Sequence, residues 1–313
     1  MGSYTTVDLP LAKKILALYD LGKVTNLKAL SSGISNSNYR VQIGNKYYLL
    51  KVSNDKNQSQ LNQEMNILNA LSDKNFDYSL KPIILKNQKY TYQLDQYFGV
   101  LFPFLEGIPP GANDQTCFEI GQGLARLHNI QWNEDELNNI REYSQVGDNL
   151  DSISQFVENF TCPLDFKSSY NDLLKPNLAK WNLADKRTSL IHGDLYYDNT
   201  LFDQNKLSAI LDFEQSGHGH TLLDLGISIS GTCLHKGRII RPLIDSYLKG
   251  YNRERKFTDE ENELLDLAII IGLFSISLWR IKRFTIGTLD PSMRDSYKNL
   301  IYKAKIFHDL NGH

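Results

Sequence analysis

Residues 189–214 place acidic and amide side chains at intervals that suit phosphoryl transfer. They read His-x-Asp-x-x-x-x-Asn, beginning at His192, and then Asp-Phe-Glu, beginning at Asp212. Such a transfer needs one group that orients a hydroxyl and others that hold a divalent metal against polyphosphate oxygens. Asp194 suits the first task. Asn199 and Asp212 suit the second, because amide and carboxylate oxygens are ligands that Mg²⁺ prefers. His192 is expected to be a structural histidine that fixes the loop.

A hairpin is predicted to bring the two metal donors together. If residues 200–203 pair with 207–211 about a Gln-Asn-Lys turn, Asn199 lies within a residue or two of the position opposite Asp212. Cross-strand and diagonal neighbours are roughly 5 to 8 Å apart, a span that one metal-triphosphate unit can bridge. Solvated turn residues are the alternative for any one of these side chains. Their joint spacing between apolar strand segments favours a functional site.

The chain around this segment is predicted to form two unequal parts. The first part, residues 1–102, is β-rich, and the second, residues 103–313, is mainly helical, which gives an α+β fold class. In the first part we expect helices at 7–20 and 59–71, strands at 39–43, 47–52, 81–85 and 89–94, and a strand that leaves as a connector at 100–107. In the second part we expect helices at 115–129, 150–160, 168–180, 240–251 and 259–284.

Composition excludes several classes of protein. The 313 residues include 34 basic and 36 acidic side chains, a net charge of -2 that does not favour nucleic-acid binding. The longest unbroken apolar run, residues 267–274, has eight residues, fewer than the ~20 that span a membrane. The N-terminus lacks the pattern of a secretory signal, and three widely spaced cysteines fit neither a disulfide framework nor a zinc site. A cytoplasmic protein is therefore expected.

The motifs resemble the aminoglycoside phosphotransferase and choline kinase superfamily, which has a protein-kinase-like fold. That superfamily has His-Gly-Asp where protein kinases have His-Arg-Asp, as at His192 here. The resemblance implies a bilobal enzyme that uses ATP and Mg²⁺, with Asp194 as the catalytic residue and Asn199 and Asp212 as metal ligands. It also implies that Asp224 is a second, structural aspartate that supports the catalytic loop.

The same resemblance implies a nucleotide site in the first part. Lys51 at the end of a β-run and Glu64 on the following helix would form the pair that holds the α- and β-phosphates. The phosphate-covering loop would contain Ser35 and Asn36, although a polar turn is nearly as good an explanation for it. At the connector between the lobes, the Pro103 carbonyl and the Leu105 amide would meet the adenine edge.

Two features favour a small-molecule acceptor over a protein. Protein kinases usually carry a lysine two residues after the catalytic aspartate, and this position is Tyr196 here. The twelve steps from Asp212 to Asp224 leave no room for a long peptide-presenting segment. The predicted partners are thus ATP and a small-molecule alcohol, with neither nucleic acid nor membrane.

Within the superfamily the chain resembles the bacterial homoserine kinases. Residues 33–39 look like that family's Gly-x-x-Asn-Ser/Thr-Asn-Tyr loop, and residues 192–199 resemble a loop that often reads His-Ala-Asp-Leu-Phe-x-Asp-Asn. Two departures point to the wider superfamily: Gly193 stands where that loop has alanine, and Lys51 stands where a basic residue is not always found.

Several acceptors stay open, and each requires a different pocket. Homoserine needs a cation for its carboxylate and an acid for its ammonium, for which Arg280, Arg283 and Glu214 are candidates. Choline needs an aromatic cage, for which the candidates are Trp279, Tyr196, Tyr197 and Phe284. Aminoglycosides prefer an acidic rim such as residues 133–136. A pseudokinase that binds nucleotide without chemistry is less favoured, because every motif residue is present.

Overall fold

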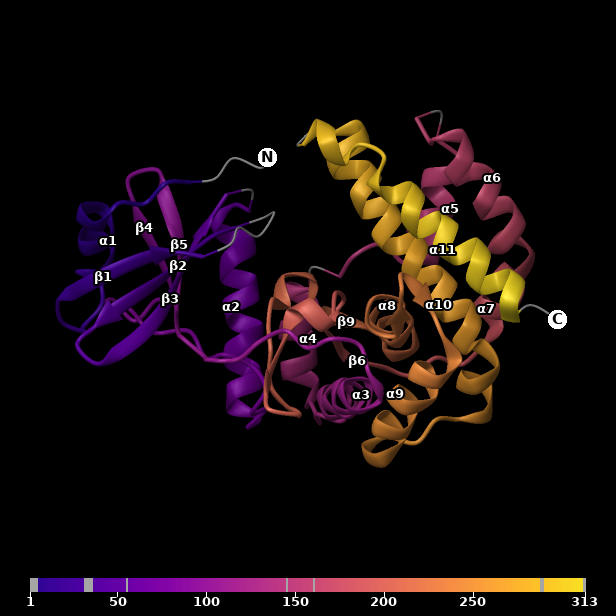
Figure 1. The fold of residues 1–313 in the computed structure, drawn as a ribbon, viewed down its shortest axis with the longest axis horizontal. Helices are drawn as coiled ribbons and strands as arrows, with labels where there is room; N and C mark the ends of the chain where they lie inside the picture. The colour runs from indigo at the N-terminus through magenta and orange to yellow at the C-terminus, as the bar shows by residue number, and fades with distance from the viewer. Residues whose placement is uncertain are drawn as a thin grey trace. The chain divides into compact units, whose positions relative to one another are not determined.

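The computed structural model describes residues 5–30, 36–54, 56–144, 146–159, 161–287 and 290–311. Contacts divide the chain into two compact units, Met1–Glu106 and Gly107–His313, called unit 1 and unit 2 below. Unit 1 is built around a β-sheet, whereas unit 2 is mainly helical (Figure 1). The predicted boundary after residue 102 falls within the last strand of unit 1.

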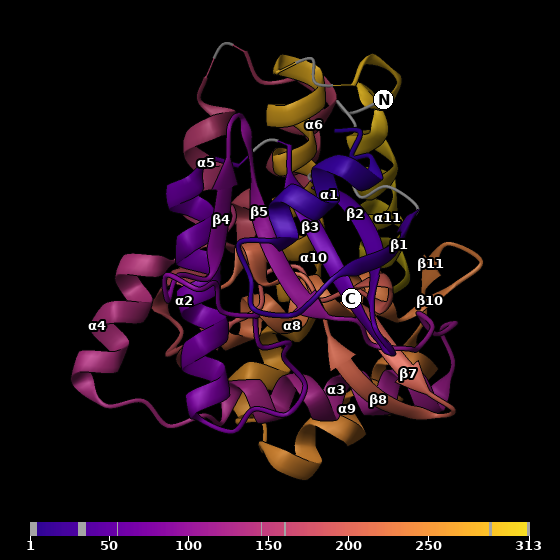
Figure 2. The same cartoon turned by 90° about the vertical axis from the view of Figure 1, so that its left-hand side faces the viewer.

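Unit 1 is a five-stranded antiparallel sheet with a helix on each face. Its elements are α1 (Leu9–Leu16), β1 (Val24–Ala29), β2 (Asn36–Ile43), β3 (Lys46–Ser53), α2 (Gln58–Asp73), β4 (Thr91–Leu94) and β5 (Tyr97–Pro103). The strand order is β1-β2-β3-β5-β4. α1 and α2 lie on opposite faces of the sheet, as the two views in Figures 1 and 2 show.

The two faces of this sheet differ in chemistry. Because side chains alternate along a strand, Tyr39, Val41 and Ile43 of β2 all point into one hydrophobic core, which also contains α1 residues. The intervening residues of β2 therefore point to the other face. The register places Asn38 opposite Lys51 there. The sheet thus presents polar side chains on the face that α2 covers.

One strand prediction for unit 1 was wrong, and one strand was missed. Residues 81–85 are irregular and form only scattered backbone contacts, such as Ile83 N to Leu101 O at 2.7 Å, and Pro82 has no N–H for a ladder. β1 was not predicted, because only Val24 of its six residues is buried and its sequence lacks apolar alternation. The predicted turn at Gly44 between β2 and β3 is confirmed.

A stack of side chains fixes the last residues of unit 1. The Arg40 guanidinium lies 3.9 Å from the centroid of the Tyr47 ring and 4.8 Å from that of Phe104. It also binds the Glu106 carboxylate at 2.8 Å, and the Phe104 amide donates to the Tyr47 carbonyl at 3.0 Å. The segment that follows β5 is therefore attached to the sheet as far as Glu106.

Unit 2 contains most of the helices and three short antiparallel strand pairs. Its helices are α3 (Asp114–His128), α4 (Glu134–Tyr143), α5 (Leu150–Val157), α6 (Leu164–Leu173), α7 (Leu178–Leu183), α8 (Thr221–Thr232), α9 (Arg241–Glu254), α10 (Asp259–Arg280) and α11 (Ser296–Asn311). Its strands are β6 (Thr188–Ile191), β7 (Thr200–Asp203), β8 (Lys206–Ile210), β9 (Gly217–His220), β10 (Leu234–His235) and β11 (Arg238–Ile239). They pair as β6 with β9, β7 with β8, and β10 with β11.

The core of unit 2 forms around α8 and α10. A Cβ on Gly226 would lie 2.0 Å from the Ala268 carbonyl oxygen, so the two helices pack closely because this position is glycine. With its π-helical extension, Ile281–Ile286, α10 is long and apolar enough to cross a membrane by length and composition. Because 78% of its apolar window is buried inside the protein, it has the burial of a core helix.

The helices predicted at 115–129, 150–160, 240–251 and 259–284 are present as α3, α5, α9 and α10. The helix predicted at 168–180 is instead split between α6 and α7 by a 3₁₀ turn, Lys175–Asn177, which contains Pro176. α8 was missed because nearly all of it is buried, so its sequence shows no stripe. α4 was missed because its charged first turn was interpreted only as an acidic cluster.

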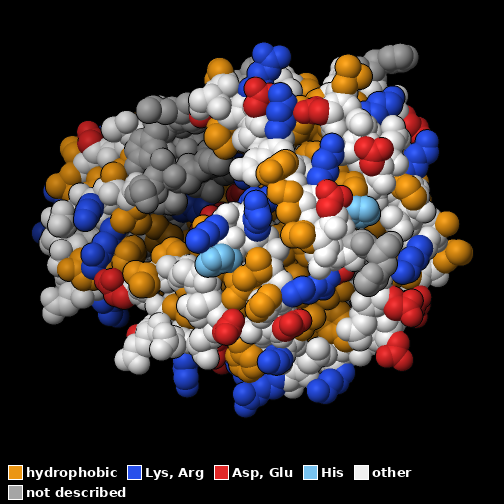
Figure 3. All heavy atoms as spheres, turned by 45° about the vertical axis from the view of Figure 1, so that its right-hand side comes forward, with side chains coloured by type: hydrophobic (Ala, Val, Ile, Leu, Met, Phe, Trp, Pro, Cys, Tyr) orange, Lys and Arg blue, Asp and Glu red, His pale blue; other side chains and the backbone are white. Residues whose placement is uncertain are grey.

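The outer surface carries charges of both signs. On the face drawn in Figure 3, Lys and Arg side chains are interspersed with Asp and Glu. This agrees with the near balance of 34 basic and 36 acidic residues in the sequence. Charge of one sign is instead concentrated locally in unit 2, in the loop between β6 and β7 and the turn after β8.

Candidate active site

The loop between β6 and β7 carries the predicted catalytic aspartate. Asp194 is half-buried there, immediately after Gly193, whose φ of +78° is a left-handed conformation suited to glycine. A Cβ at this position would also lie 2.4 Å from the Gln215 carbonyl oxygen. The loop therefore passes close to the turn that follows β8.

Asn199 and His192 hold Asp194 from its two sides. The Asn199 amide nitrogen donates to the Asp194 carbonyl oxygen at 2.8 Å and to its carboxylate at 3.2 Å. The Asp194 backbone N–H donates to Nδ1 of His192 at 3.2 Å, so the proton of a neutral ring is on Nε2, which donates to the Leu211 carbonyl at 2.9 Å. Both ring nitrogens of His192 are thus bonded to backbone.

The β7–β8 hairpin brings Asn199 next to Asp212, as its spacing predicted. Thr200 pairs with Ile210, and the Leu211 amide donates to the Asn199 carbonyl at 2.8 Å. The turn is shorter than predicted, because Lys206 belongs to β8 and pairs with Asp203. Asp212 itself has φ +64°, a left-handed conformation that aspartate tolerates better than most residues.

Four carboxylates make this part of unit 2 strongly negative. Burial raises the pKa of Asp194 well above its usual range, and the charges of Asp212, Glu214 and Asp198 raise it further. The hydrogen bond from Asn199 acts in the opposite direction. Such a concentration of negative charge favours binding of cations.

The oxygens of Asn199 and Asp212 fit a metal ion that takes most of its ligands from water and phosphate. Among the described residues, no cluster of three or more His, Cys, Asp or Glu side chains has the arrangement of a metal site. Because the amide nitrogen of Asn199 is bonded to Asp194, its carbonyl oxygen is the atom left for a cation. Asn199 and Asp212 would then supply two oxygens, which matches the way Mg²⁺ binds together with waters and phosphate oxygens.

Asp224 of α8 anchors the loop from behind. Its two carboxylate oxygens accept the backbone N–H groups of His192 and Gly193, both at 2.8 Å. Oδ2 also contacts Nε2 of His128 at 3.0 Å. Burial by itself raises the pKa of Asp224, but the hydrogen bond and charge of His128 and the interactions with His192 hold it below its usual range. Asp224 therefore stays ionised and fixes the backbone just before Asp194.

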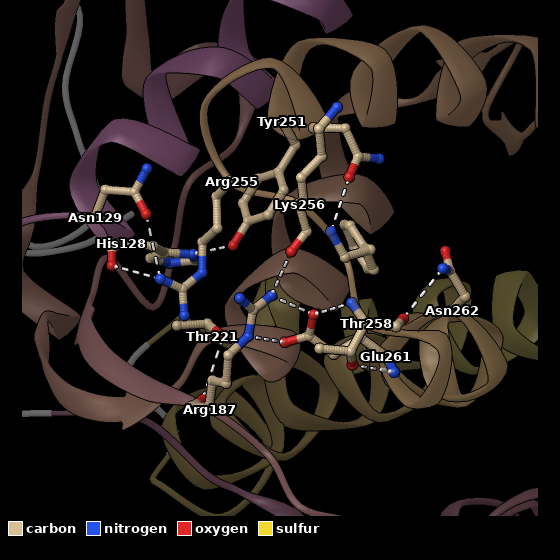
Figure 4. A network of polar contacts seen from close by, with 12 residues as sticks. His128, Asn129, Arg187, Thr221, Tyr251, Arg255, Lys256, Thr258, Glu261 and Asn262 are labelled. Carbon is tan, nitrogen blue, oxygen red and sulfur yellow. Dashed lines mark hydrogen bonds and ion pairs between the residues drawn. The ribbon is translucent and has the colours of Figure 1, made fainter.

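A polar network extends from His128 to the α9–α10 connection (Figure 4). Nδ1 of His128 contacts the Tyr251 hydroxyl at 2.8 Å, and Arg255 donates to the His128 carbonyl at 3.2 Å. Beside them, Arg187 binds Glu261, whose Oε2 also accepts the Thr258 amide at 3.1 Å. The sequence predicted none of these as site residues. The signal available in the sequence was a histidine and a tyrosine in two amphipathic helical segments.

The residues proposed for the acceptor are also in unit 2. The Tyr196 ring lies over Gly231 of α8, where a Cβ would be 1.8 Å from ring carbon Cδ1. Burial and the charge of Asp194 raise the pKa of Tyr196, whose hydroxyl is hydrogen-bonded to Ser230. Arg280 is near enough to act electrostatically on Tyr196, and it donates to the Ser296 carbonyl at 3.1 Å.

Two of the four rings considered for a choline cage, Trp279 and Phe284, pack within the protein. Phe284 is 1% exposed and packs edge-on against Trp279, with ring centroids 5.8 Å apart. The Arg283 guanidinium lies over the Trp279 ring at 4.7 Å from its centroid. These rings therefore pack with protein side chains, and Arg283 is engaged by Trp279.

Of the predicted nucleotide residues of unit 1, Lys51 and Asn36 lie on the α2 side of the sheet, and Glu64 lies on α2. Lys51 Nζ lies 3.6 Å from Glu64 Oε1. Asn36 is 4% exposed, and its side-chain oxygen has no hydrogen-bond partner among the described residues. Pro103 ends β5 opposite Tyr48, and Leu105 follows with its side chain 37% exposed. Ser35 lies outside the described residues.

Comparison with known families identifies the chain. Residues 26–259 match the model of the phosphotransferase enzyme family. The chain belongs to this family. The predicted superfamily is therefore confirmed, and with it the assignment as a phosphotransferase that acts on an alcohol group. The chain is also similar to homoserine kinases of Methylobacillus flagellatus, at 24% identity over 84% of this chain and 81% of that one, and of Beijerinckia indica, at 25% over 100% and 97%.

Solved structures of this phosphotransferase family's fold resemble the whole chain. An amicoumacin kinase superposes with a TM-score of 0.70 at 16% identity, covering 97% of this chain and 98% of that one. A microcompartment-associated aminopropanol kinase superposes with a TM-score of 0.65 at 17% identity, covering 97% and 99%. The predicted kinase-like α+β fold is confirmed.

Proposed function

We propose that the protein transfers the γ-phosphate of ATP to the hydroxyl of a small amino alcohol, and that homoserine is its acceptor. The arrangement of Asp194, Asn199 and Asp212 carries this proposal. It places one half-buried carboxylate beside an amide oxygen and a second carboxylate suited to a divalent cation. Family membership and the similarity to homoserine kinases support it.

Unit 1 would bind the nucleotide. Lys51, oriented by Glu64, would contact the α- and β-phosphates, with Ser35 and Asn36 beside them. The Pro103 carbonyl and the Leu105 amide would face the adenine edge. The similar amicoumacin kinase was solved in complex with AMP-PNP and Ca²⁺, which supports a nucleoside triphosphate and a divalent cation as ligands of the shared fold.

Asn199 and Asp212 would hold the cation, for which we propose Mg²⁺. When bound, it would neutralise charge on the phosphate oxygens. The chain's own residues would meanwhile orient the acceptor. Asn199 fixes the Asp194 carboxylate, and Asp224 fixes the backbone just before it.

In the transfer, the acceptor hydroxyl oxygen forms a bond to the γ-phosphorus as the bond from that phosphorus to the β,γ-bridging oxygen breaks. ADP leaves with the electron pair, and the hydroxyl proton passes to Asp194. A carboxylate whose pKa is raised by burial and by neighbouring charges is a better proton acceptor than an ordinary one. His192 takes no part in this step, because both of its ring nitrogens bind backbone.

Arg280 and Glu214 favour homoserine among the possible acceptors. The positive charge of Arg280 acts on Tyr196, and the negative charge of Glu214 acts on Asp194. A zwitterionic substrate needs both, with its carboxylate near Arg280 and its ammonium near Glu214. Choline has no carboxylate, and two of the four rings proposed to cage it, Trp279 and Phe284, pack with protein side chains.

An ADP-release screen tests the proposal. The purified protein with Mg-ATP would be offered homoserine, choline, ethanolamine, aminopropanol and aminoglycosides in a coupled assay. Turnover highest with homoserine is expected. If turnover is highest with an amino alcohol that lacks a carboxylate, homoserine is not the acceptor, but the proposed phosphate transfer stands. A thermal shift with Mg-ATP but no ADP release on any acceptor would favour the pseudokinase.

A further inference from the structure

Two lysines bind opposite oxygens of one glutamate in unit 1. Lys51 Nζ lies 3.6 Å from Oε1 of Glu64, and Lys56 Nζ lies 3.1 Å from Oε2. The side chains are 10%, 11% and 2% exposed for Lys51, Lys56 and Glu64. Glu64 is the partner proposed for the phosphate-binding lysine. Lys56, the nearer of the two cations, has no role in the proposed function.

Hydrogen bonds hold the backbone at the Lys56 carbonyl and at the residue after it. The Ser53 hydroxyl donates to the Lys56 carbonyl at 3.2 Å, just beyond the end of β3. The next residue, Asn57, caps α2, accepting the Gln60 amide at 2.9 Å while its own amide binds the Gln60 side chain at 3.0 Å. Lys56 thus precedes a firmly capped helix start. Its side chain reaches along α2 to Glu64, about two turns further on.

We infer that Lys56 is a positioning residue of the nucleotide site, which holds Glu64 so that Lys51 is presented to the phosphates. The inference rests on the proposed binding of nucleotide by unit 1. Because each lysine takes a different carboxylate oxygen, they do not compete for one position. The bond to Oε2 fixes the plane of the carboxylate, and this sets the direction of Oε1 and of Lys51.

Charge gives a second reason for this role. Lys51 and Glu64 alone would form a neutral pair, whereas the three side chains together carry one positive charge. Lys56 balances Glu64 when Lys51 turns its ammonium to a phosphate oxygen, so that the 2% exposed carboxylate is never left without a counter-charge. Charge-assisted bonds of this kind change affinity by about one to two orders of magnitude when one partner is removed.

Nucleotide binding by three single variants tests the inference. Lys56→Met should raise the Kd of Mg-AMP-PNP, measured by calorimetry, about tenfold and raise KM for ATP in parallel, with little change in kcat. Lys56→Arg keeps a cation at this position and should restore most of the affinity. Lys46→Met removes an exposed lysine from the start of β3 and should leave Kd unchanged.

A double variant separates positioning from folding. If Lys56 acts through Glu64, the effects will not add, and Lys56→Met/Glu64→Gln should bind nucleotide as Glu64→Gln does. This pair also stays informative if Lys56→Met alone folds poorly, because it removes the carboxylate that would lose its counter-charge. Additive losses, or Lys56→Met binding as tightly as the unaltered protein or more tightly, would overturn the inference and leave the proposed function standing. An unaltered protein that fails to bind Mg-AMP-PNP would overturn both.

Discussion

The Asn199 amide nitrogen donates to both the carbonyl oxygen and the carboxylate of Asp194, at 2.8 and 3.2 Å. One side chain therefore ties Asp194 to the start of the β7–β8 hairpin. Since the same hairpin ends beside Asp212, its short turn sets the spacing of all three residues. The relative positions of these three residues therefore depend on one short stretch of chain, and an insertion or deletion in the hairpin would change them.

Asp194→Asn should abolish turnover while keeping nucleotide binding. The new side chain keeps an oxygen that accepts the bond from Asn199, so the loop conformation should survive, but it has no charge to take up a proton. Loss of a general base costs about 10²- to 10⁴-fold in kcat. The coupled ADP-release assay measures the loss, and Asp172→Asn, at an exposed carboxylate of α6, is the control. Near-normal turnover would show that Asp194 does not have this role.

Arg280→Gln should discriminate between acceptors. If Arg280 binds the substrate carboxylate, the variant should raise KM for homoserine about 10- to 100-fold, the value of a charge-assisted bond, without raising KM for ATP. Aminopropanol has no carboxylate and should be affected much less. Arg294→Gln removes an exposed arginine from the segment after α10 and should behave as the unaltered protein. Equal losses for both acceptors would argue against a carboxylate contact.

Gly231→Ala should displace Tyr196 from α8. The new methyl group would lie 1.8 Å from a ring carbon, so the ring must move and its bond to Ser230 must break. Overpacking of this kind costs about 1–3 kcal/mol. We expect KM for the acceptor to rise more than KM for ATP, and steady-state kinetics with each substrate varied will show it. Gly111→Ala, where a Cβ meets nothing within 4 Å, is the matched control.

Acid should destabilise unit 2 through His128. Burial lowers the pKa of His128, and the charge of Arg255 lowers it further, whereas Asp224 and Glu261 raise it. The Tyr251 hydroxyl contacts Nδ1 of the same ring. The unfolded chain binds a proton near pH 6.5 and the folded chain only at lower pH. This contribution to stability is thus present above about pH 6.5 and lost as pH falls towards the folded pKa. Thermal unfolding between pH 5 and 8 should show a shallower loss for His128→Gln, and an unchanged slope would refute the assignment.

The sequence predicted contacts between residues that are close along the chain and missed those between distant residues. Asp194, Asn199 and Asp212 lie within one loop and one hairpin, so their spacing alone indicated that they meet. The contact between His128 and Asp224 spans 96 residues and depends on how α3 and α8 pack, which no local pattern encodes. A local pattern can also mislead. The apolar, β-branched run at 81–85 predicted a strand, although Pro82 lacks the N–H that a strand ladder needs.

The stack on Arg40 limits the freedom of the chain between the two units. It attaches residues up to Glu106 to unit 1, while the Ile108 carbonyl and the Phe202 amide, 3.1 Å apart, attach the chain to unit 2 only two residues later. Gly107 itself lies against β7, where an added Cβ would be 3.0 Å from that of Leu201. The boundary between the units therefore falls at a single peptide link, with the residue on each side bound to its own unit.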